Sequence, residues 1–187
     1  MQAARDRLVT ILRHAHAGER GAMHAYRGHW QSVRDPVERL EIRRIGSEEV
    51  DHRRRVLRIL VALGGELDAR LETKMQRIGR AIGVFCHVGG WFLPMYGAGL
   101  LESRNVEEYE EAARCAAACG RPEFIEDLRD MAEVERRHEA YFRGKSAAHW
   151  LWRVLPRWRV PAAAGTMFPV PHSSPTLPSW PRASSHS

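Results

Sequence analysis

Cysteine is scarce in this chain, and the few cysteines form no recognisable site. Cys86, Cys115 and Cys119 make no C-x-x-C pair and give an odd count, so neither a disulfide framework nor a zinc site is predicted. The first residues lack the apolar run of a secretory signal. We therefore expect a cytoplasmic protein in a reducing compartment.

A nucleic-acid signature is also lacking, although the formal net charge is +6. An excess of positive charge makes nucleic acid and anionic membrane surfaces candidate partners. Here arginine carries nearly all the positive charge and is scattered among glutamates on predicted helices. No aromatic-interleaved RNA-binding motif accompanies it, so we predict no nucleic-acid partner.

Proline is nearly absent from the first 143 residues. Seven of the ten prolines and four of the six tryptophans follow Gly144. We therefore divide the chain into a helical domain over residues 1–143, a basic and aromatic segment over 144–160, and a Pro/Ser-rich tail over 161–187 that is predicted to be disordered. The basic and aromatic segment suits a membrane interface and a groove on the domain equally well.

Long apolar runs are lacking with one exception, residues 81–101, which contain no Asp, Glu, Lys or Arg. The run is nominally long enough to span a bilayer. A single uninterrupted helix is not expected, because the run contains Gly83, Gly89, Gly90, Pro94, Gly97 and Gly99. We favour instead a segment that packs on the domain and dips into a membrane surface; a full span is the alternative. We expect a peripheral protein on the inner face of the cell membrane.

Four stretches repeat apolar residues at intervals of three and four, the period of an amphipathic helix. The first covers about residues 6–34 and the second about 36–63, joined by a turn short enough to make them antiparallel. The third includes residues 101–116, and the fourth follows Pro122. A connection over about residues 64–95 is long enough to cross the domain. These features predict an all-α, ferritin-like four-helix bundle with one long crossover and an apolar membrane-surface segment.

Six side chains of metal-ligand type fall on these apolar faces. They are Glu19 in the first helix, Glu49 and His52 in the second, Glu102 in the third, and Glu135 and His138 in the fourth. Ferritin-like di-metal bundles take one Glu from each of two helices and a Glu-x-x-His pair from each of the other two. Ionised glutamates are almost never buried without a partner. We predict that the six residues bind two metal ions. The alternative is that the buried side of each helix is assigned wrongly and that these charges lie on the surface.

The heights of the ligands along the helices give a partial check. Glu19 and Glu49 reach nearly the same height in an antiparallel pair, whereas Glu102 and Glu135 differ by about one helical turn. Glu108 would match Glu135 better but lies on the flank of its apolar face, so it is the alternative ligand. Four carboxylates and two imidazoles without a thiolate suit iron or manganese over zinc. We therefore predict two Fe ions as cofactors, with Mn as the alternative.

The segment His16-Ala17-Gly18-Glu19, with Gly21, Ala22 and Tyr26 downstream, resembles the first helix of the demethoxyubiquinone hydroxylase family, part of the ferritin-like di-iron superfamily. The resemblance covers about residues 8–143 and continues through Glu49-x-x-His52, Glu102 with Tyr109 seven residues later, and Glu135-x-x-His138. The chain departs from the family at Glu108, where a histidine is common, and after Gly144, where a further amphipathic helix is usual.

The resemblance implies a di-iron monooxygenase that uses O2 and reducing electrons to hydroxylate the ring of 3-demethoxyubiquinol to 3-demethylubiquinol in ubiquinone biosynthesis. The six residues would bind iron, and Tyr109 would line the site near its oxygen-activating face. The implied partners are a quinone or other lipid-soluble substrate, a membrane surface, O2 and an electron donor, for which NADH is a candidate. A homo-oligomer is compatible with the sequence.

Two other functions stay open at this point. One is a ferritin-like iron-binding or ferroxidase protein without an organic substrate. The other is a metal-free scaffold at a membrane surface, in which the buried-site glutamates would be dispensable.

Overall fold

The computed structural model describes residues 1–159. Over that range the protein is all-helical, with five α-helices, two 3₁₀ helices and no strand. The elements are α1 (Gln2–Ser32), α2 (Pro36–Ala62), α3 (Ala69–Val88), α4 (Phe92–Ala118), η1 (Pro122–Phe124), α5 (Ile125–Ala147) and η2 (Trp150–Arg153). The Pro/Ser-rich tail predicted over 161–187 lies outside the described residues.

The helix ends follow from capping residues in the sequence. The carboxylate of Asp35 accepts hydrogen bonds from the backbone N–H groups of Val37 and Glu38, and Pro36 fills the first helical position of α2. Asp68 caps α3 in the same way. Gly64 follows α2 and Gly120 follows α4, with φ values of 68° and 74°, a left-handed conformation that glycine adopts without a Cβ penalty.

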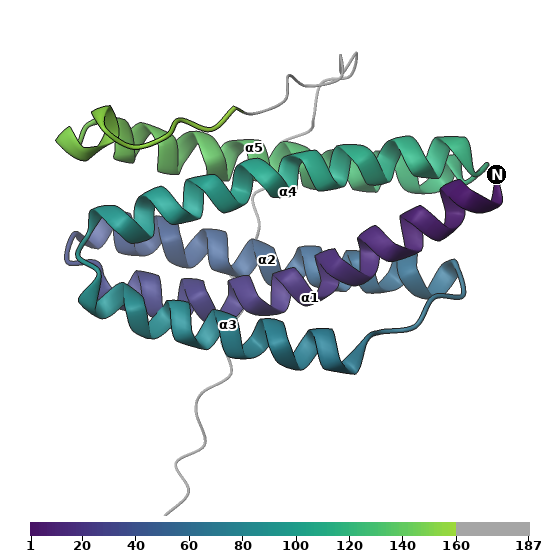
Figure 1. Ribbon diagram of the computed structural model, residues 1–187, viewed down its shortest axis with the longest axis horizontal. Coiled ribbons are helices and arrows are strands. Elements are labelled where there is room, and N and C mark those ends of the chain that lie inside the picture. The colour runs from purple at the N-terminus through teal and green to yellow at the C-terminus, as the bar shows by residue number, and fades with distance from the viewer. Residues whose placement is uncertain (160–187) are drawn as a thin grey trace, which may run out of the picture.

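The five helices lie roughly along one axis (Figure 1). α1 and α2 form one antiparallel pair and α4 and α5 another, and α1 also packs against α4. α3 lies beside α1 and connects the end of α2 to the start of α4. The connection expected over residues 64–95 is therefore itself largely helical, a feature that the sequence reading did not include.

Glycines allow α1 and α3 to touch through their backbones. A Cβ atom added at Gly79 would overlap the carbonyl oxygen of Gly21, and one added at Gly28 would overlap that of Gly83. Because neither helix carries a side chain at these contacts, the two backbones approach more closely than ordinary helix packing permits.

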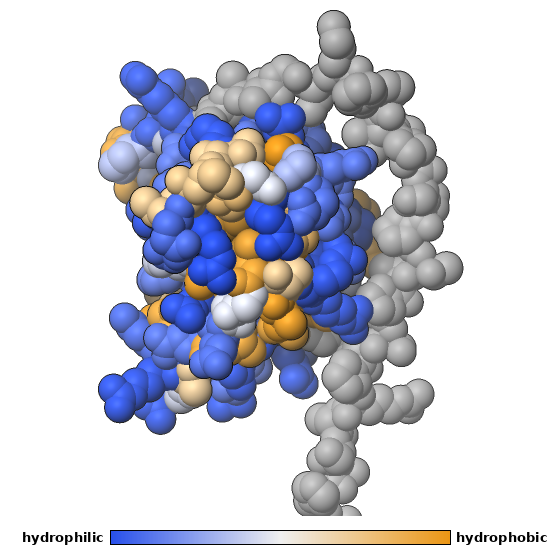
Figure 2. Space-filling model, turned by 90° about the vertical axis from the view of Figure 1, so that its right-hand side faces the viewer, coloured by the Kyte–Doolittle hydropathy of each residue, from blue (hydrophilic) through white to orange (hydrophobic). Residues whose placement is uncertain are grey.

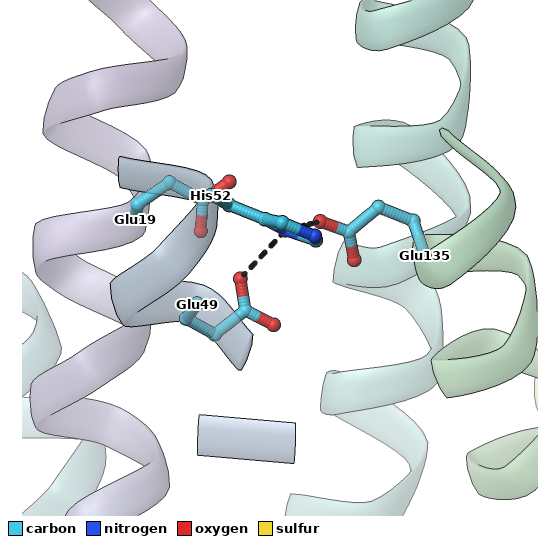
Figure 3. Close-up of side chains that lie close together, drawn as sticks. All are labelled: Glu19, Glu49, His52 and Glu135. Carbon is cyan, nitrogen blue, oxygen red and sulfur yellow. Dashed lines mark hydrogen bonds and ion pairs between the residues drawn. The ribbon is translucent and has the colours of Figure 1, made fainter. Parts of the chain in front are cut away.

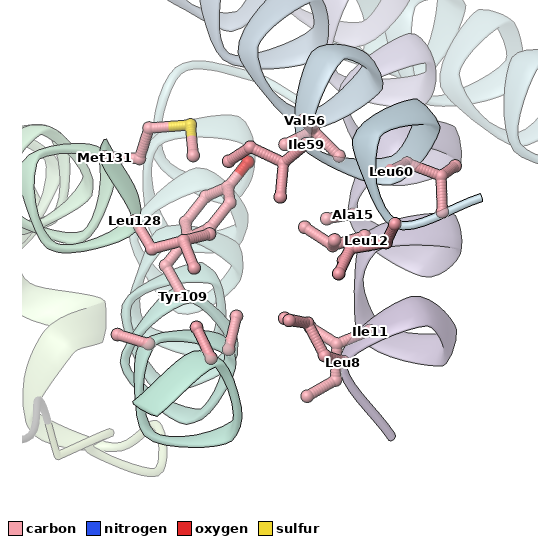
Figure 4. Close-up of a cluster of buried hydrophobic side chains, with 14 of the residues drawn as sticks. Leu8, Ile11, Leu12, Ala15, Val56, Ile59, Leu60, Tyr109, Leu128 and Met131 are labelled. Carbon is pink, nitrogen blue, oxygen red and sulfur yellow. The ribbon is translucent and has the colours of Figure 1, made fainter. Parts of the chain in front are cut away.

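Two apolar cores fill the bundle, one on each side of a polar layer. The first joins residues of α1 and α2, such as Leu12 and Ile59, to Tyr109, Leu128 and Met131 of α4 and α5 (Figure 4). The second contains Ala22, Tyr26, Val33, Ile42, Ile45, Met95 and Phe142. On each of the four helices, the predicted metal ligands lie in sequence between residues of the two cores.

The apolar run over residues 81–101 is divided between two helices. α3 ends at Val88, a turn follows with Gly90 at φ 72°, and α4 begins at Phe92. Across the described residues, no helix is both long enough and apolar enough to cross a membrane. The predicted break in the run is confirmed at Gly89 and Gly90. The prediction was wrong for Gly83 in α3 and for Gly97 and Gly99 in α4, which lie within helices.

The surface is mostly charged but carries apolar side chains at both ends. Figure 2 views the end near the N-terminus, where hydrophilic side chains surround a central apolar area; Met1, Val61 and Leu67 are exposed large apolar residues of this part of the chain. At the opposite end, Val84 and Val88 of α3 are 69% and 79% exposed.

The described part of the basic and aromatic segment turns back onto the bundle. Trp158 donates a hydrogen bond from Nε1 to Glu139 Oε1 at 2.8 Å and meets Trp152 and Tyr96 edge to face. Trp150, by contrast, is 68% exposed. Two tryptophans of this segment therefore pack against residues of α4 and α5, and a third lies at the surface.

Candidate metal centre

The six predicted ligands converge in the polar layer between the two cores. They form two overlapping groups whose ligand atoms lie within 4.8 Å of one another: Glu19, Glu49, His52 and Glu135, and then Glu49, Glu102, Glu135 and His138. None of the six is more than 3% exposed. Figure 3 shows the first group, in which side chains of α1, α2 and α5 point toward one another.

Both histidines direct Nδ1 at the carboxylates. His52 Nδ1 lies 2.9 Å from Glu135 Oε1 and 3.7 Å from Glu49 Oε2. His138 Nδ1 lies 3.3 Å from Glu135 Oε2 and 3.3 Å from Glu49 Oε1. Glu49 and Glu135 therefore each face both imidazoles, an arrangement suited to bridging two cations.

Several carboxylate oxygens in this layer have no hydrogen-bond donor. Both side-chain oxygens of Glu49 and Oε2 of Glu19 are buried without a hydrogen-bond partner. Leaving a buried polar atom unsatisfied costs about 1–3 kcal/mol, and more for a charged group. Because these oxygens belong to the same cluster, a cation between them would satisfy the whole set. The donor set thus fits a metal ion.

The carboxyl groups divide into two kinds by their pKa. Burial raises the pKa of Glu19 well above its ordinary value, as does the nearby charge of Glu49. Burial also raises the pKa of Glu102, with the charges of Glu135 and Glu49 adding to it. For Glu49, burial is outweighed by the favourable interactions of its carboxylate with Glu19 and with both imidazoles, so its pKa is lowered. The pKa of Glu135 is also lowered, because both imidazoles outweigh burial and the charge of Glu49.

The imidazoles are held as cations by the same carboxylates. Burial alone would lower the pKa of His52, but the charge of Glu135, a hydrogen bond with Glu135 and the nearby carboxylate of Glu49 raise it to about 9. The pKa of His138 is raised well above its ordinary value for the same reason. Without metal, the pKa shifts therefore favour the neutral form of Glu19 and Glu102, the ionised form of Glu49 and Glu135, and the cationic form of both imidazoles.

Two tyrosines link the ligands of α1 and α4 crosswise. Tyr109 donates its hydroxyl proton to Glu19 Oε1 at 2.5 Å, and Tyr26 donates to Glu102 Oε1. Asn105 Nδ2 donates to the second oxygen of Glu102 at 3.0 Å. Each tyrosine follows the glutamate of its own helix by seven residues, so the two halves of the centre repeat one pattern.

A further carboxylate orients His138. Its Nε2 lies 2.6 Å from Glu48 Oε2, and Arg44 holds the other oxygen of Glu48 at 2.5 Å. Metal-binding histidines usually donate their second ring N–H to such a group, which fixes the tautomer and the ring orientation. Glu48 therefore leaves Nδ1 of His138 free to face the centre.

Compared with protein-family models, curated proteins and solved structures, the chain matches none.

The structure brings all six predicted residues together and places Tyr109 beside them through Glu19. Glu108 does not join them: it lines a surface groove of about 310 Å³ between α1 and α4, together with Arg7, His14 and Arg104. Although the sequence predicts that Glu102 and Glu135 differ in height by about one helical turn, the structure places their ligand atoms in one group.

Sequence reasoning missed the groups that surround the ligands. The apolar periodicity does not identify Tyr26 as a hydrogen-bond donor to Glu102, nor Glu48 as a partner of His138. The spacing of Tyr26 from Glu19, which equals that of Tyr109 from Glu102, was a usable signal for the first. Nothing local marks Glu48, because its partner His138 lies 90 residues away on α5.

A second buried polar cluster joins α1, α2 and α3 outside the metal centre. His16 Nδ1 lies 2.6 Å from Glu72 Oε1, and Arg20 and Arg53 reach the other oxygen of Glu72 at 3.3 and 2.8 Å. This cluster contains the first residue of the His16-Ala17-Gly18-Glu19 segment and ties α3 to the bundle. His16 thus has a structural partner and is not among the grouped metal ligands.

Proposed function

We propose that this protein is a di-iron monooxygenase of the ferritin-like class, acting on the ring of a lipid-soluble quinol of the 3-demethoxyubiquinol type. The observation that carries the proposal is the buried, donor-poor carboxylate cluster, in which both oxygens of Glu49 lack a hydrogen-bond partner beside two imidazoles. In this reading α1, α2, α4 and α5 are the four helices of the bundle, and α3 is the crossover.

The donor set supports iron or manganese. Four carboxylates and two imidazoles offer oxygen and nitrogen ligands without a thiolate, a combination that suits these metals better than zinc. Two divalent ions would balance four ionised carboxylates while both imidazoles are neutral. Glu19, Glu49 and His52 would form one half of the site, and Glu102, Glu135 and His138 the other. Two iron ions, when bound, would supply the reduction of O2.

The protein's own part is to hold the ligands and to keep water out. The two apolar cores close the polar layer on both sides. Tyr109 and Tyr26 each fix one oxygen of a glutamate, which leaves the second oxygen of Glu19 directed to the centre. Glu48 holds the ring of His138. Such preorganisation lets a site react without first reordering its ligands.

Exposed apolar side chains near the α3–α4 turn support a membrane-derived substrate. Val84, Phe85 and Val88 of α3 are 69%, 45% and 79% exposed, and Leu93 of α4 is 44% exposed. Apolar side chains grouped at one end of a domain suit the headgroup and acyl boundary of a bilayer. A soluble iron store would gain nothing from them, so they favour the oxygenase over a ferroxidase.

Metal content and turnover test the proposal together. Plasma mass spectrometry of protein loaded anaerobically with Fe(II) should find about two irons per chain, and the Glu49→Ala/Glu135→Ala variant should lose them. Glu107→Ala/Glu123→Ala, which removes two exposed glutamates, is the matched control and should keep them. Oxygen-dependent hydroxylation of demethoxyubiquinol in vesicles would then be measured.

The outcomes separate the three candidate functions. Iron with hydroxylation supports the monooxygenase. Iron that is oxidised by O2 without any change in the quinol indicates a ferroxidase. If neither the wild-type protein nor the control variant binds metal, the monooxygenase and the ferroxidase are both contradicted, and the metal-free scaffold is the function that is left.

A further inference from the structure

A second cavity opens at the end of the bundle where α1 ends and α4 begins. Its volume is about 480 Å³, and its lining includes His29, Val33, Cys86, Trp91 and Pro94. This volume lies in the range of small-molecule sites. Trp91 both lines the cavity and is 37% exposed, so the cavity adjoins the apolar surface around the α3–α4 turn.

His29 contributes to this cavity a polar atom that has no hydrogen-bond partner. Its side chain is 3% exposed, and its Nε2 atom is buried without a hydrogen-bond partner. Of the residues that line the cavity, none other contributes such an atom within the part of the chain that the structure describes. Burial lowers the pKa of His29 to about 4, so the ring is neutral at physiological pH and offers one donor and one acceptor.

Several other polar groups of the cavity are held by partners, while Arg34 and His87 line it from its exposed side. Burial raises the pKa of Cys86 to about 11, which keeps it a thiol. Glu38 accepts a hydrogen bond from Trp91 Nε1 at 2.7 Å and pairs with Lys145 at 2.9 Å. Asp35 caps α2. On its buried side, the cavity therefore offers a ligand one polar atom without a partner, Nε2 of His29.

Aromatic rings connect this cavity to the metal centre. The ring of His29 stacks on Tyr26 and Phe142, with centroid distances of 6.3 and 5.9 Å. Tyr26 in turn bonds Glu102. His29 stands ten residues after Glu19 on α1, or about 15 Å along the helix. A ligand in the cavity would thus be separated from the candidate metal ligands by one aromatic layer.

We propose that this cavity binds a neutral, hydroxyl-bearing aromatic ring, held by a hydrogen bond between its oxygen and the imidazole of His29. The class of ring rests on the proposed function, in which the substrate is a quinol. The existence of the site rests on the cavity and on His29. The cavity lies at the apolar end of the molecule, where a lipid-soluble ring would arrive. The aromatic layer that contains Tyr26 separates it from the candidate metal ligands.

The test compares two rings that differ in the hydroxyl group. Binding of 4-methoxyphenol and of 1,4-dimethoxybenzene to the full-length protein would be measured by ligand-observed NMR titration. A site that hydrogen-bonds a hydroxyl discriminates against an analogue that lacks it, and we expect the phenol to bind at least about tenfold more tightly. His29→Leu should abolish that preference. His87→Leu, which alters an exposed histidine of the same cavity, should retain it.

His29→Gln guards against a misfolded variant, because it keeps a hydrogen-bonding group at the same position and should keep part of the preference. An unchanged preference in His29→Leu would overturn the inference. So would failure of both rings to bind wild-type protein at millimolar concentration.

The metal-centre proposal can fail separately. Glu49→Ala/Glu135→Ala should lose metal but keep the His29-dependent preference for the phenol. If the wild-type protein binds metal but neither ring, the cavity proposal alone is refuted. If the wild-type protein binds the phenol through His29 but takes up no metal, the metal-centre proposal alone is refuted.

Discussion

Tyr26 and Tyr109 occupy equivalent positions on opposite sides of the candidate metal centre. Each lies seven residues after a candidate ligand on its own helix and donates its hydroxyl proton to the candidate ligand of the other helix. The bonds tie α1 to α4 at two levels. They also fix which oxygen of Glu19 remains directed to the centre.

Tyr109→Phe is expected to weaken metal binding by roughly tenfold to a hundredfold, the usual effect of removing a group that orients a ligand. Without metal it should also lower the free energy of unfolding by about 1–3 kcal/mol, because Glu19 Oε1 loses its donor in a buried site. Chelator competition measures the first effect and urea denaturation the second.

Tyr141→Phe is the matched control for that substitution. The hydroxyl of Tyr141 is buried and has no hydrogen-bond partner, so its removal should leave metal affinity unchanged and should not destabilise the protein. Equal losses in the two variants would mean that the hydrogen bond from Tyr109 to Glu19 is not the cause.

Glu48→Gln should reduce metal affinity by roughly tenfold to a hundredfold without removing a ligand. Its carboxylate holds Nε2 of His138 at 2.6 Å, and an amide holds an imidazole less strongly than a carboxylate does. Glu41→Gln is the control, because Glu41 also pairs with Arg44 but does not contact His138. Isothermal titration with Fe(II) or Mn(II) under argon would compare the two; similar affinities would argue against a role for Glu48.

Metal binding should release protons. Without metal, the pKa values of Glu19, Glu102 and His138 lie well above their ordinary values and that of His52 is about 9. Each of these four groups therefore keeps its proton to a higher pH than it would in an unfolded chain, and each must be deprotonated to become a ligand. The affinity should rise with pH for the same reason.

Titrations in two buffers of different ionisation enthalpy measure the number of released protons directly. Glu49→Ala/Glu135→Ala corrects for metal bound elsewhere on the chain. A release near zero would show that the ligands are already deprotonated before metal arrives.

The sequence predicted the helices and the burial of the six candidate ligands because both depend on periodicity. Candidate positions such as Glu19 and Glu49 lie on apolar faces that repeat every three or four residues, so the helix period carries them inward together. The sequence did not predict that Glu102 and Glu135 reach the same height, yet the structure places their ligand atoms in one group.

Contacts between distant elements could not be predicted in this way. The bonds of Glu48 to His138 and of Tyr26 to Glu102 join residues 90 and 76 positions apart, and no local pattern specifies them. The helical nature of the connection was missed because α3 packs through Gly79 and Gly83 rather than through large apolar side chains, so glycine in the sequence read as an interruption and not as a contact.

Stability should fall as the pH decreases from about 6.5 to about 4, in part because of His29. Its pKa is about 4 in the folded protein, against an ordinary value of 6.5, so below pH 6.5 the unfolded chain binds a proton that the folded protein does not. The stability lost by pH 4 through this group is roughly 3 kcal/mol. Urea denaturation at several pH values would compare wild type with His29→Leu.

In that comparison, His29→Leu removes one titrating group and should flatten the wild-type dependence over this window, while steeper losses from the carboxylates remain in both proteins. Curves that stay parallel from pH 6.5 to pH 4 would show that His29 titrates normally in the fold.

Gly79→Ala and Gly144→Ala should change stability in opposite directions, although both replace a glycine within a helix. A Cβ at Gly79 would overlap the carbonyl oxygen of Gly21, and backbone cannot move aside as a flexible side chain can. We expect α3 to be displaced from α1, with a loss of about 1–3 kcal/mol or more. At Gly144 in α5 nothing lies within 4 Å, so alanine should add about 0.5–1 kcal/mol through helix propensity. Thermal and urea unfolding of the two variants would measure both changes in stability. A stabilised Gly79→Ala variant would mean that α1 and α3 are not in backbone contact in solution.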